Sequence, residues 1–216
     1  MITLHSEELI FLHSLTKSGS LTGLNISPSP KSDEERFAEM EKSLHQHGIL
    51  KDKQFTDKGL IAMRLIEDYK GSKEHLLINN ISVAMNTGEN TCVVFDVSTG
   101  ELVISRPLKA TIWKLLIEQN EVLQQQRTYD GIGFIAKAQT RELFYSDLEN
   151  GRAKLLFYIK RYEENHLRED YIYCEENEKI YRFDLLREQK LERDSQELRA
   201  DFLKLLQLEG SGLRVR

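Results

Sequence analysis

The sequence contains few of the residues that staple small proteins together or hold structural metals. Of its 216 residues, two are cysteine, three are proline and one is tryptophan. Two thiols are too few for a disulfide framework, and Cys92 and Cys174 do not have the spacing of metal ligands. Each cysteine falls inside a predicted strand, so we interpret both as reduced core residues of a cytosolic protein.

Long apolar runs and a strong net charge are also missing. No run approaches the ~18 residues that a bilayer-spanning helix needs. Residues Met1 to Glu8 lack the basic start and apolar core of a signal peptide. The net charge of -5 gives no long-range attraction to nucleic acid or anionic lipid. We therefore expect a cytoplasmic protein with no membrane insertion and no nucleic-acid partner.

Catalytic and metal-binding motifs are scarce in the same way. The chain has no Gly-x-Ser-x-Gly elbow, no His-Glu-x-x-His, no P-loop and no Gly-x-Gly-x-x-Gly. Gly131-Ile132-Gly133 is interpreted as a turn. His45 and His47 lie about 200° apart around a helix, and the other histidines are scattered. The sequence predicts a protein that is not an enzyme and has no cofactor and no metal site.

The residues that are present suit a globular protein with a sizeable core. The chain is 40% hydrophobic and 30% charged, which is ordinary for a soluble domain. We expect one compact domain made of four segments: an N-terminal helical subdomain (1–73), a first half (74–126), a connector with a short helix (127–152) and a second half with a C-terminal helix (153–216).

Three helices are predicted in the N-terminal segment. They begin at Ser6, at Ser32 or Asp33, and at Thr56, where a side-chain oxygen can cap the helix. The second of these helices carries Phe37, Met40 and Leu44 on one face. The loop from Gly19 to Lys31 is interrupted by Gly and Pro, and its apolar members, Leu21, Leu24 and Ile26, are expected to lie on the body of the protein.

The two halves of the chain share one pattern, three strands followed by a helix. The first half has strands at Leu76–Met85, Thr91–Val97 and Glu101–Ser105 and a helix from Pro107 to Leu123. The second has strands at Lys154–Ile159, Tyr171–Cys174 and Lys179–Phe183 and a helix from Leu186 to Leu208. Period-2 alternation at Val93, Phe95 and Val97 indicates sheet. The pattern predicts an α+β fold whose central, largely antiparallel sheet comes from two quasi-repeated β-β-β-α halves.

The connector is less regular than the two halves. Phe134 to Ala136 is compatible with strand or helix, and a helix is predicted from Thr140 to Leu148.

One stretch is compatible with DNA binding. Residues Glu39 to Leu65 follow the order helix, short extended piece with Phe55, helix, as at the end of a winged helix. In that interpretation the Asp33–His47 helix would enter the major groove. It carries five carboxylates against Arg36 and Lys42, and a helix of this sign is repelled by phosphate. The charge of this helix thus argues against DNA binding, and a winged-helix-like DNA-binding transcriptional regulator is the second of two functional hypotheses, the alternative.

A second resemblance covers about residues 1 to 120 in sequence and the rest in pattern. It is carried by Glu41-Lys42-Ser43-Leu44-His45-Gln46-His47-Gly48-Ile49-Leu50, by Asp52 and the helix after it, and by a meander with Gly100 in its last turn. This order resembles EspG-type proteins, the cytosolic substrate chaperones of type VII (ESX) secretion systems. The chain is shorter and richer in Lys and Glu than typical members, as in a diverged branch.

The resemblance implies a function and a set of contact residues. It implies a cytosolic chaperone or adaptor for type VII secretion that recognises helical-hairpin secreted proteins without catalysis. Members of the family grip their substrates with a loop between strands and with C-terminal helices. On this sequence the implied partner-binding residues are Asn86, Thr87, Gly88, Glu89, Asn90, Ser98, Thr99, Leu206 and Leu208. Leu198, Phe202 and Leu205 are expected to pack on the sheet, and a homodimer burying the same stripe is the other expected partner arrangement.

Overall fold

The structure divides the chain into two compact units. It is a computed structural model that describes residues 1–17, 19–88, 90–98, 101–125 and 135–209. The first unit comprises Met1–Pro107 with Tyr162–His166, and the second comprises Leu108–Arg161 with Leu167–Arg216. The division at 107/108 falls inside the predicted segment 74–126, and the predicted boundary after residue 73 falls inside the first unit. Among the described residues, no helix combines the length and apolarity that a membrane crossing requires.

The first unit contains three helices, α1 (Ser6–Leu15), α2 (Asp33–Gln46) and α3 (Asp57–Gly71). Two of them begin at a capping side chain, whereas α1 follows His5, which makes no side-chain cap hydrogen bond. The Ser32 side chain accepts a hydrogen bond from the Glu35 backbone N–H, and Thr56 accepts one from that of Gly59. Because these caps lie within a few residues of the helices they start, the sequence predicted both starts correctly. The strands β2 (Leu50–Lys51) and β3 (Gln54–Phe55) form a small hairpin between α2 and α3.

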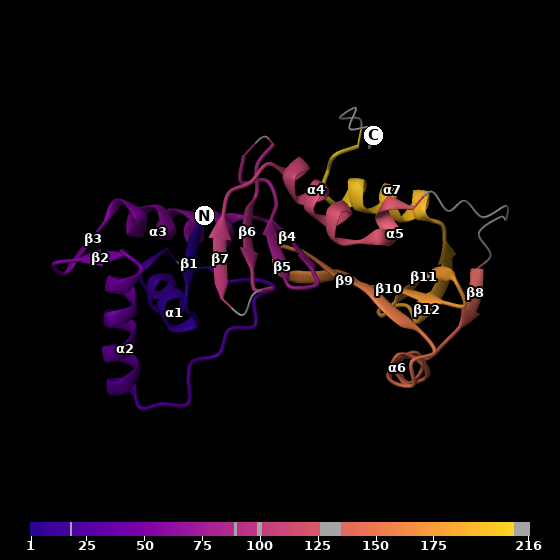
Figure 1. The fold of residues 1–216 in the computed structure, drawn as a ribbon, viewed down its shortest axis with the longest axis horizontal. Coiled ribbons are helices and arrows are strands. Elements are labelled where there is room, and N and C mark those ends of the chain that lie inside the picture. Colours follow the sequence, from indigo (N-terminus) through magenta and orange to yellow (C-terminus); the bar gives the residue numbers. More distant parts are fainter. Residues whose placement is uncertain (18, 89, 99–100, 126–134, 210–216) are drawn as a thin grey trace. The chain divides into compact units, whose positions relative to one another are not determined.

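The sheet of the first unit has the strand order β1-β7-β6-β5-β4 (Figure 1). Its strands are β1 (Ile2–Leu4), β4 (Glu74–Ile78), β5 (Ile81–Ala84), β6 (Val93–Asp96) and β7 (Leu102–Ser105), and neighbours pair antiparallel. The prediction of one strand over Leu76–Met85 is wrong. Asn79, with φ of 51°, and Asn80 turn the chain, so the apolar run is two paired strands.

The core of the first unit lies between this sheet and the three helices. Leu9 and Leu12 of α1, Leu44 of α2 and Ile66 of α3 are fully buried in one cluster with Phe95 of β6. The loop residues Leu21, Leu24 and Ile26 pack against the same cluster, as predicted. Tyr69 ties the loop to the sheet, because its hydroxyl donates to the Thr22 carbonyl and is also hydrogen-bonded to Ser82.

The second unit also combines an antiparallel sheet with helices. Its strand order is β9-β10-β11-β12-β8. Its elements are α4 (Lys109–Gln119), α5 (Glu121–Gln124), β8 (Ile135–Ala138), α6 (Arg141–Glu149), β9 (Lys154–Glu163), β10 (His166–Glu176), β11 (Lys179–Asp184), β12 (Gln189–Arg193) and α7 (Ser195–Leu205). Phe144 of α6 stacks on Phe183 of β11 with ring centres 4.2 Å apart. Phe202 of α7 packs edge-on against Phe157 of β9.

The predicted helix from Leu186 to Leu208 is wrong in its first half. Residues 189–193 form β12, which pairs with β11 and places Leu191 opposite Arg182. The helix begins only at Ser195, after Asp194 accepts the Glu197 backbone N–H in a capping box. Leu191 and Leu198 are seven residues apart, which is a helical spacing, but strand pairing decides the structure of Leu191. The predicted helix at Thr140–Leu148 is confirmed as α6, and Ile135–Ala138 forms a strand.

The corrected boundaries reveal a longer internal repeat than the sequence indicated. Each half has an edge strand, then a helical segment (α1 to α3 with the β2–β3 hairpin in the first half, α6 alone in the second), then a four-stranded meander, then a further helix. In the first half, β1 pairs antiparallel with β7, the last strand of the meander; in the second half, β8 pairs antiparallel with β12. The α+β class and the antiparallel sheet are therefore confirmed, and each half contributes four meander strands instead of three.

The two cysteines occupy core positions in this framework. Cys92 and Cys174 form no disulfide, and both are fully buried. Burial raises the pKa of the Cys174 thiol to about 11, which leaves it protonated and unreactive at neutral pH.

Candidate functional site

A groove of about 270 Å³ lies between α1 and α2 in the first unit. The side chains that line it come from one face of each helix, at spacings of three, four and seven residues. On α1 these are Glu7, Ile10, Phe11 and Ser14, and on α2 they are Asp33, Arg36, Phe37 and Met40. The volume is just below the ~300–1,000 Å³ of typical small-molecule pockets, so the groove has room for a few side chains.

Apolar side chains contribute more of the groove's lining surface than polar ones. Met40 is buried at its base and packs in the core cluster of the unit, and Phe11 packs against that cluster. Phe37 is 58% exposed, although it lies one helical turn from Met40. The sequence predicted that Phe37 shares one face of α2 with Met40 and Leu44. Met40 and Leu44 are buried, whereas the Phe37 ring lies in the groove and is open to solvent. An exposed aromatic beside an apolar hollow is a common feature of protein-binding surfaces.

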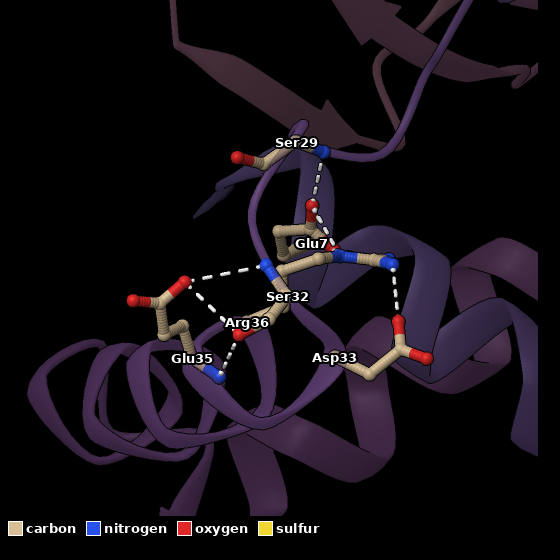
Figure 2. A network of polar contacts seen from close by, with 6 residues as sticks. All are labelled: Glu7, Ser29, Ser32, Asp33, Glu35 and Arg36. Carbon is tan, nitrogen blue, oxygen red and sulfur yellow. Dashed lines mark hydrogen bonds and ion pairs between the residues drawn. The ribbon is translucent and has the colours of Figure 1, made fainter.

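A network of polar contacts joins α1, the loop before α2 and the first turn of α2 (Figure 2). Arg36 donates to the Glu7 carboxylate from Nε at 3.1 and 3.2 Å and from Nη2 at 2.9 Å. The backbone N–H of Ser29 donates to the same carboxylate at 2.5 Å, and Arg36 Nη1 donates to Asp33 at 3.1 Å. The hydrogen bond from Arg36 lowers the pKa of Glu7, against the opposing effect of burial. Glu7 is thus held ionised, which suits it for positioning α2 and not for proton transfer.

A second contact fixes α2 at its other end. Glu8 is fully buried, and its carboxylate oxygens lie 2.9 and 3.0 Å from Nδ1 of His47, the residue that ends α2. The backbone N–H of His5 donates to Glu8 at 2.7 Å. Two successive glutamates of α1 therefore hold the first turn and the last turn of α2, so the groove is formed before any partner arrives.

The exposed surface beside the groove is acidic. Residues 31–42 carry five carboxylates and three cations. Two of the cations are neutralised within this region: Arg36 is bound by Glu7 and Asp33, and Lys31 Nζ lies 2.6 Å from Glu39. The Asp33 side chain is 98% exposed. A ligand with apolar side chains next to cations fits the apolar side chains of the groove and the acidic surface beside it.

The predicted partner-binding turns do not form one site. Asn86, Gly88 and Asn90 are exposed and Thr87 is half-buried in the β5–β6 connection, whereas Ser98 is exposed in the β6–β7 connection. These connections leave opposite ends of β6, whose four residues separate them by roughly 13 Å at ~3.3 Å per residue. Two further predicted residues, Glu89 and Thr99, lie outside the described residues.

The predicted binding positions on the last helix are largely core. Leu206, which was expected on a binding face, is fully buried, and Leu208 is half-buried. The helix ends at Leu205, and Leu206 follows as its C-cap, with its backbone N–H donating to the Phe202 carbonyl and its side chain fully buried. Leu198, Phe202 and Leu205 are buried, as predicted.

The α1–α2 groove was missed by the sequence analysis, although its signal is present. Glu7, Ile10, Phe11 and Ser14 have the same three- and four-residue spacing as Asp33, Arg36, Phe37 and Met40. Periodicity alone cannot tell a face that packs on a core from one that lines an open groove.

The titratable side chains that line the groove are engaged in ion pairs. They are Glu7, Asp33 and Arg36, which are paired with one another. Within the described ranges, no group of three or more His, Cys, Asp or Glu side chains converges to hold a metal ion.

The chain matches one protein family. Searches against curated proteins and against solved structures found no match. The family described as "Domain of unknown function (DUF5081)" matches residues 2–207. This range includes β1, the α1–α2 groove, both meanders and α7. The chain therefore belongs to the DUF5081 family.

Proposed function

We propose that this protein is a cytoplasmic chaperone or adaptor that binds helical-hairpin proteins destined for type VII secretion, without catalysing a reaction on them. The observation that carries the proposal is the preformed groove between α1 and α2, with the exposed Phe37 at its edge. A groove with apolar side chains between two helices is a usual receptor for the apolar stripe of a third helix. A secreted helical hairpin presents such a stripe and needs it covered before export.

The internal repeat adds support of a different kind. The resemblance to EspG-type chaperones implies a quasi-symmetric repeat around a sheet. The two copies of strand, helical segment, four-stranded meander and helix agree with this expectation. This agreement concerns the fold, and the groove is the feature that bears on what is bound.

The alternative function, a winged-helix-like regulator, has less support. The β2–β3 hairpin between α2 and α3 does have the order of a winged helix. However, Arg36 is occupied by Glu7 and Asp33, and the exposed side of α2 carries Glu34, Glu35, Glu39 and Glu41. Phosphate contacts need free cations, and this helix offers chiefly carboxylates.

The test is affinity capture of the tagged full-length protein from its own cells while the secretion genes are expressed, followed by mass spectrometry. We expect small helical-hairpin secreted proteins in stoichiometric amounts. Phe37→Asp places a charge in the groove and should reduce their recovery at least tenfold, because the partner would have to bury that carboxylate. Phe37 is more than half exposed, so the substitution should leave folding almost unchanged.

A matched control is Leu143→Asp on α6 of the second unit, where the side chain is 61% exposed. It should leave recovery unchanged. Recovery of no secreted helical protein, or equal recovery with Phe37→Asp, would overturn the proposal.

A further inference from the structure

A second apolar surface of the first unit lies on the outward face of α3. Leu60 and Ile61 are adjacent and are 52% and 54% exposed. With Asp57 and Arg64, which are also exposed, they form a stripe at the spacing i, i+3, i+4 and i+7. The opposite face of α3 holds Ala62, Leu65 and Ile66 in the core, so Leu60 and Ile61 are left uncovered by the described residues of their own unit.

The charge around this stripe is opposite to the charge around the groove. Residues 51–64 carry four cations, Lys51, Lys53, Lys58 and Arg64, against Asp52 and Asp57. Lys51 and Lys53 are exposed on the β2–β3 hairpin, and Arg64 makes no ion pair with any described residue. The groove offers the reverse, an apolar floor beside the acidic α2.

We infer that two copies of this chain associate, with the α3 stripe of one copy inserted into the α1–α2 groove of the other. Leu60 and Ile61 supply the apolar side chains that the groove can receive next to Phe37, and Arg64 meets the carboxylates of α2. Both surfaces belong to the first unit, and each helix is fixed within it. The exposed fractions of Leu60, Ile61 and Phe37 show that the two surfaces do not cover each other within one chain.

The contact also bears on the proposed function. If secreted helices bind the same groove, a second copy covers it until a substrate displaces it. The self-association itself does not depend on the proposed function, because it is a property of the purified protein. It can therefore be measured without any substrate.

The test uses sedimentation velocity and light scattering of the purified full-length protein from nanomolar to high micromolar concentration. We expect reversible self-association of the natural protein. Ile61→Asp and Phe37→Asp should each raise the dissociation constant at least tenfold, one by spoiling the stripe and the other by spoiling the groove. Circular dichroism spectra identical to that of the natural protein would show that each variant is folded.

Mixing the two variants distinguishes this contact from any other. Ile61→Asp keeps an intact groove and Phe37→Asp keeps an intact stripe, so an equimolar mixture should form a one-to-one complex that neither variant forms alone. Leu143→Asp, on the second unit, should associate as the natural protein does. A natural protein that stays monomeric at every concentration would overturn the inference. So would a mixture that stays monomeric while the natural protein associates. Either result leaves the capture experiment, and hence the proposed function, to be judged separately.

Discussion

Replacing Gly59 by alanine should destabilise the first unit, although alanine is the better helix former. Gly59 lies in the first turn of α3, where the chain crosses the end of α2 and the β2–β3 hairpin. A Cβ at this position would lie 2.5 Å from the Ile49 carbonyl oxygen, 3.0 Å from Phe55 Cδ1 and 3.1 Å from Ile49 Cγ2. The nearest of these atoms is backbone, so it cannot simply rotate away.

The size of the effect follows from what holds that oxygen. The Ile49 carbonyl accepts hydrogen bonds from the Thr56 backbone N–H at 3.0 Å and from the Thr56 hydroxyl at 3.2 Å. Moving it weakens two bonds worth about 1 kcal/mol each, and overpacking adds about 1–3 kcal/mol. Alanine recovers about 1 kcal/mol of helix propensity. The net loss for Gly59→Ala should be about 1–3 kcal/mol.

Gly71 provides the control at the other end of the same helix. A Cβ there meets no atom within 4 Å. Gly71→Ala should therefore be neutral or stabilising, by up to about 1 kcal/mol. Urea unfolding followed by circular dichroism measures the free energy of unfolding of both variants. In a thermal scan of a chain of this length, a change of 1 kcal/mol corresponds to about 2–4 °C in Tm. A Gly59→Ala protein as stable as Gly71→Ala would refute the reasoning about the close approach.

Two further predictions concern ionisable groups of the first unit. His75 is buried, its Nε2–H donates to the Tyr69 carbonyl at 2.9 Å, and its Nδ1 has no partner among the described residues. Burial lowers its pKa below the unfolded value of about 6.5. The unfolded chain therefore binds the proton first, and the stability that the neutral ring contributes above about pH 6.5 is lost as the pH falls. His75→Gln should flatten the decline in unfolding free energy between about pH 7 and pH 5. Part of the slope should remain, because the pKa of His13 is also lowered. An unchanged slope would contradict the conclusion that His75 contributes to the decline. Glu7→Gln removes the charge that Arg36 and the Ser29 N–H bind, and should cost about 1–2 kcal/mol in urea unfolding at pH 7; a loss that persists in an Arg36→Ala background would show that the pair is not the cause.

The sequence alone determined where several helices begin. Ser32, Thr56 and Thr140 each accept a hydrogen bond from a backbone N–H three residues later. A helix and its cap use groups only a few residues apart, so the information is local and can be read from the letters. The α+β class and the place of β6 were readable for the same reason, because side-chain direction follows a short period. The burial of β6 does not alternate, since Val93, Val94 and Phe95 are all buried and Val97, which follows the strand, is exposed.

Strand membership was decided by the tertiary structure. Ile2–Leu4 becomes a strand because β7, a hundred residues away in sequence, supplies its hydrogen bonds, with Ile2 opposite Ile104. Gln189–Arg193 is a strand because β11 and β8 lie on either side of it. A single strand satisfies none of its own backbone groups, so the deciding partner is invisible in the local sequence.

The candidate site was also decided in three dimensions. Leu206 and Phe37 are both apolar residues on or beside amphipathic helices, and the sequence assigned Leu206 to a binding face and gave Phe37 only a helix face shared with Met40 and Leu44. In the fold Leu206 is fully buried, and Phe37 is exposed and lines the groove. Periodicity reports which residues share a helix face, and it carries no information on what covers that face. Only the packing of α1 on α2, held by Glu7–Arg36 and Glu8–His47, leaves a groove there.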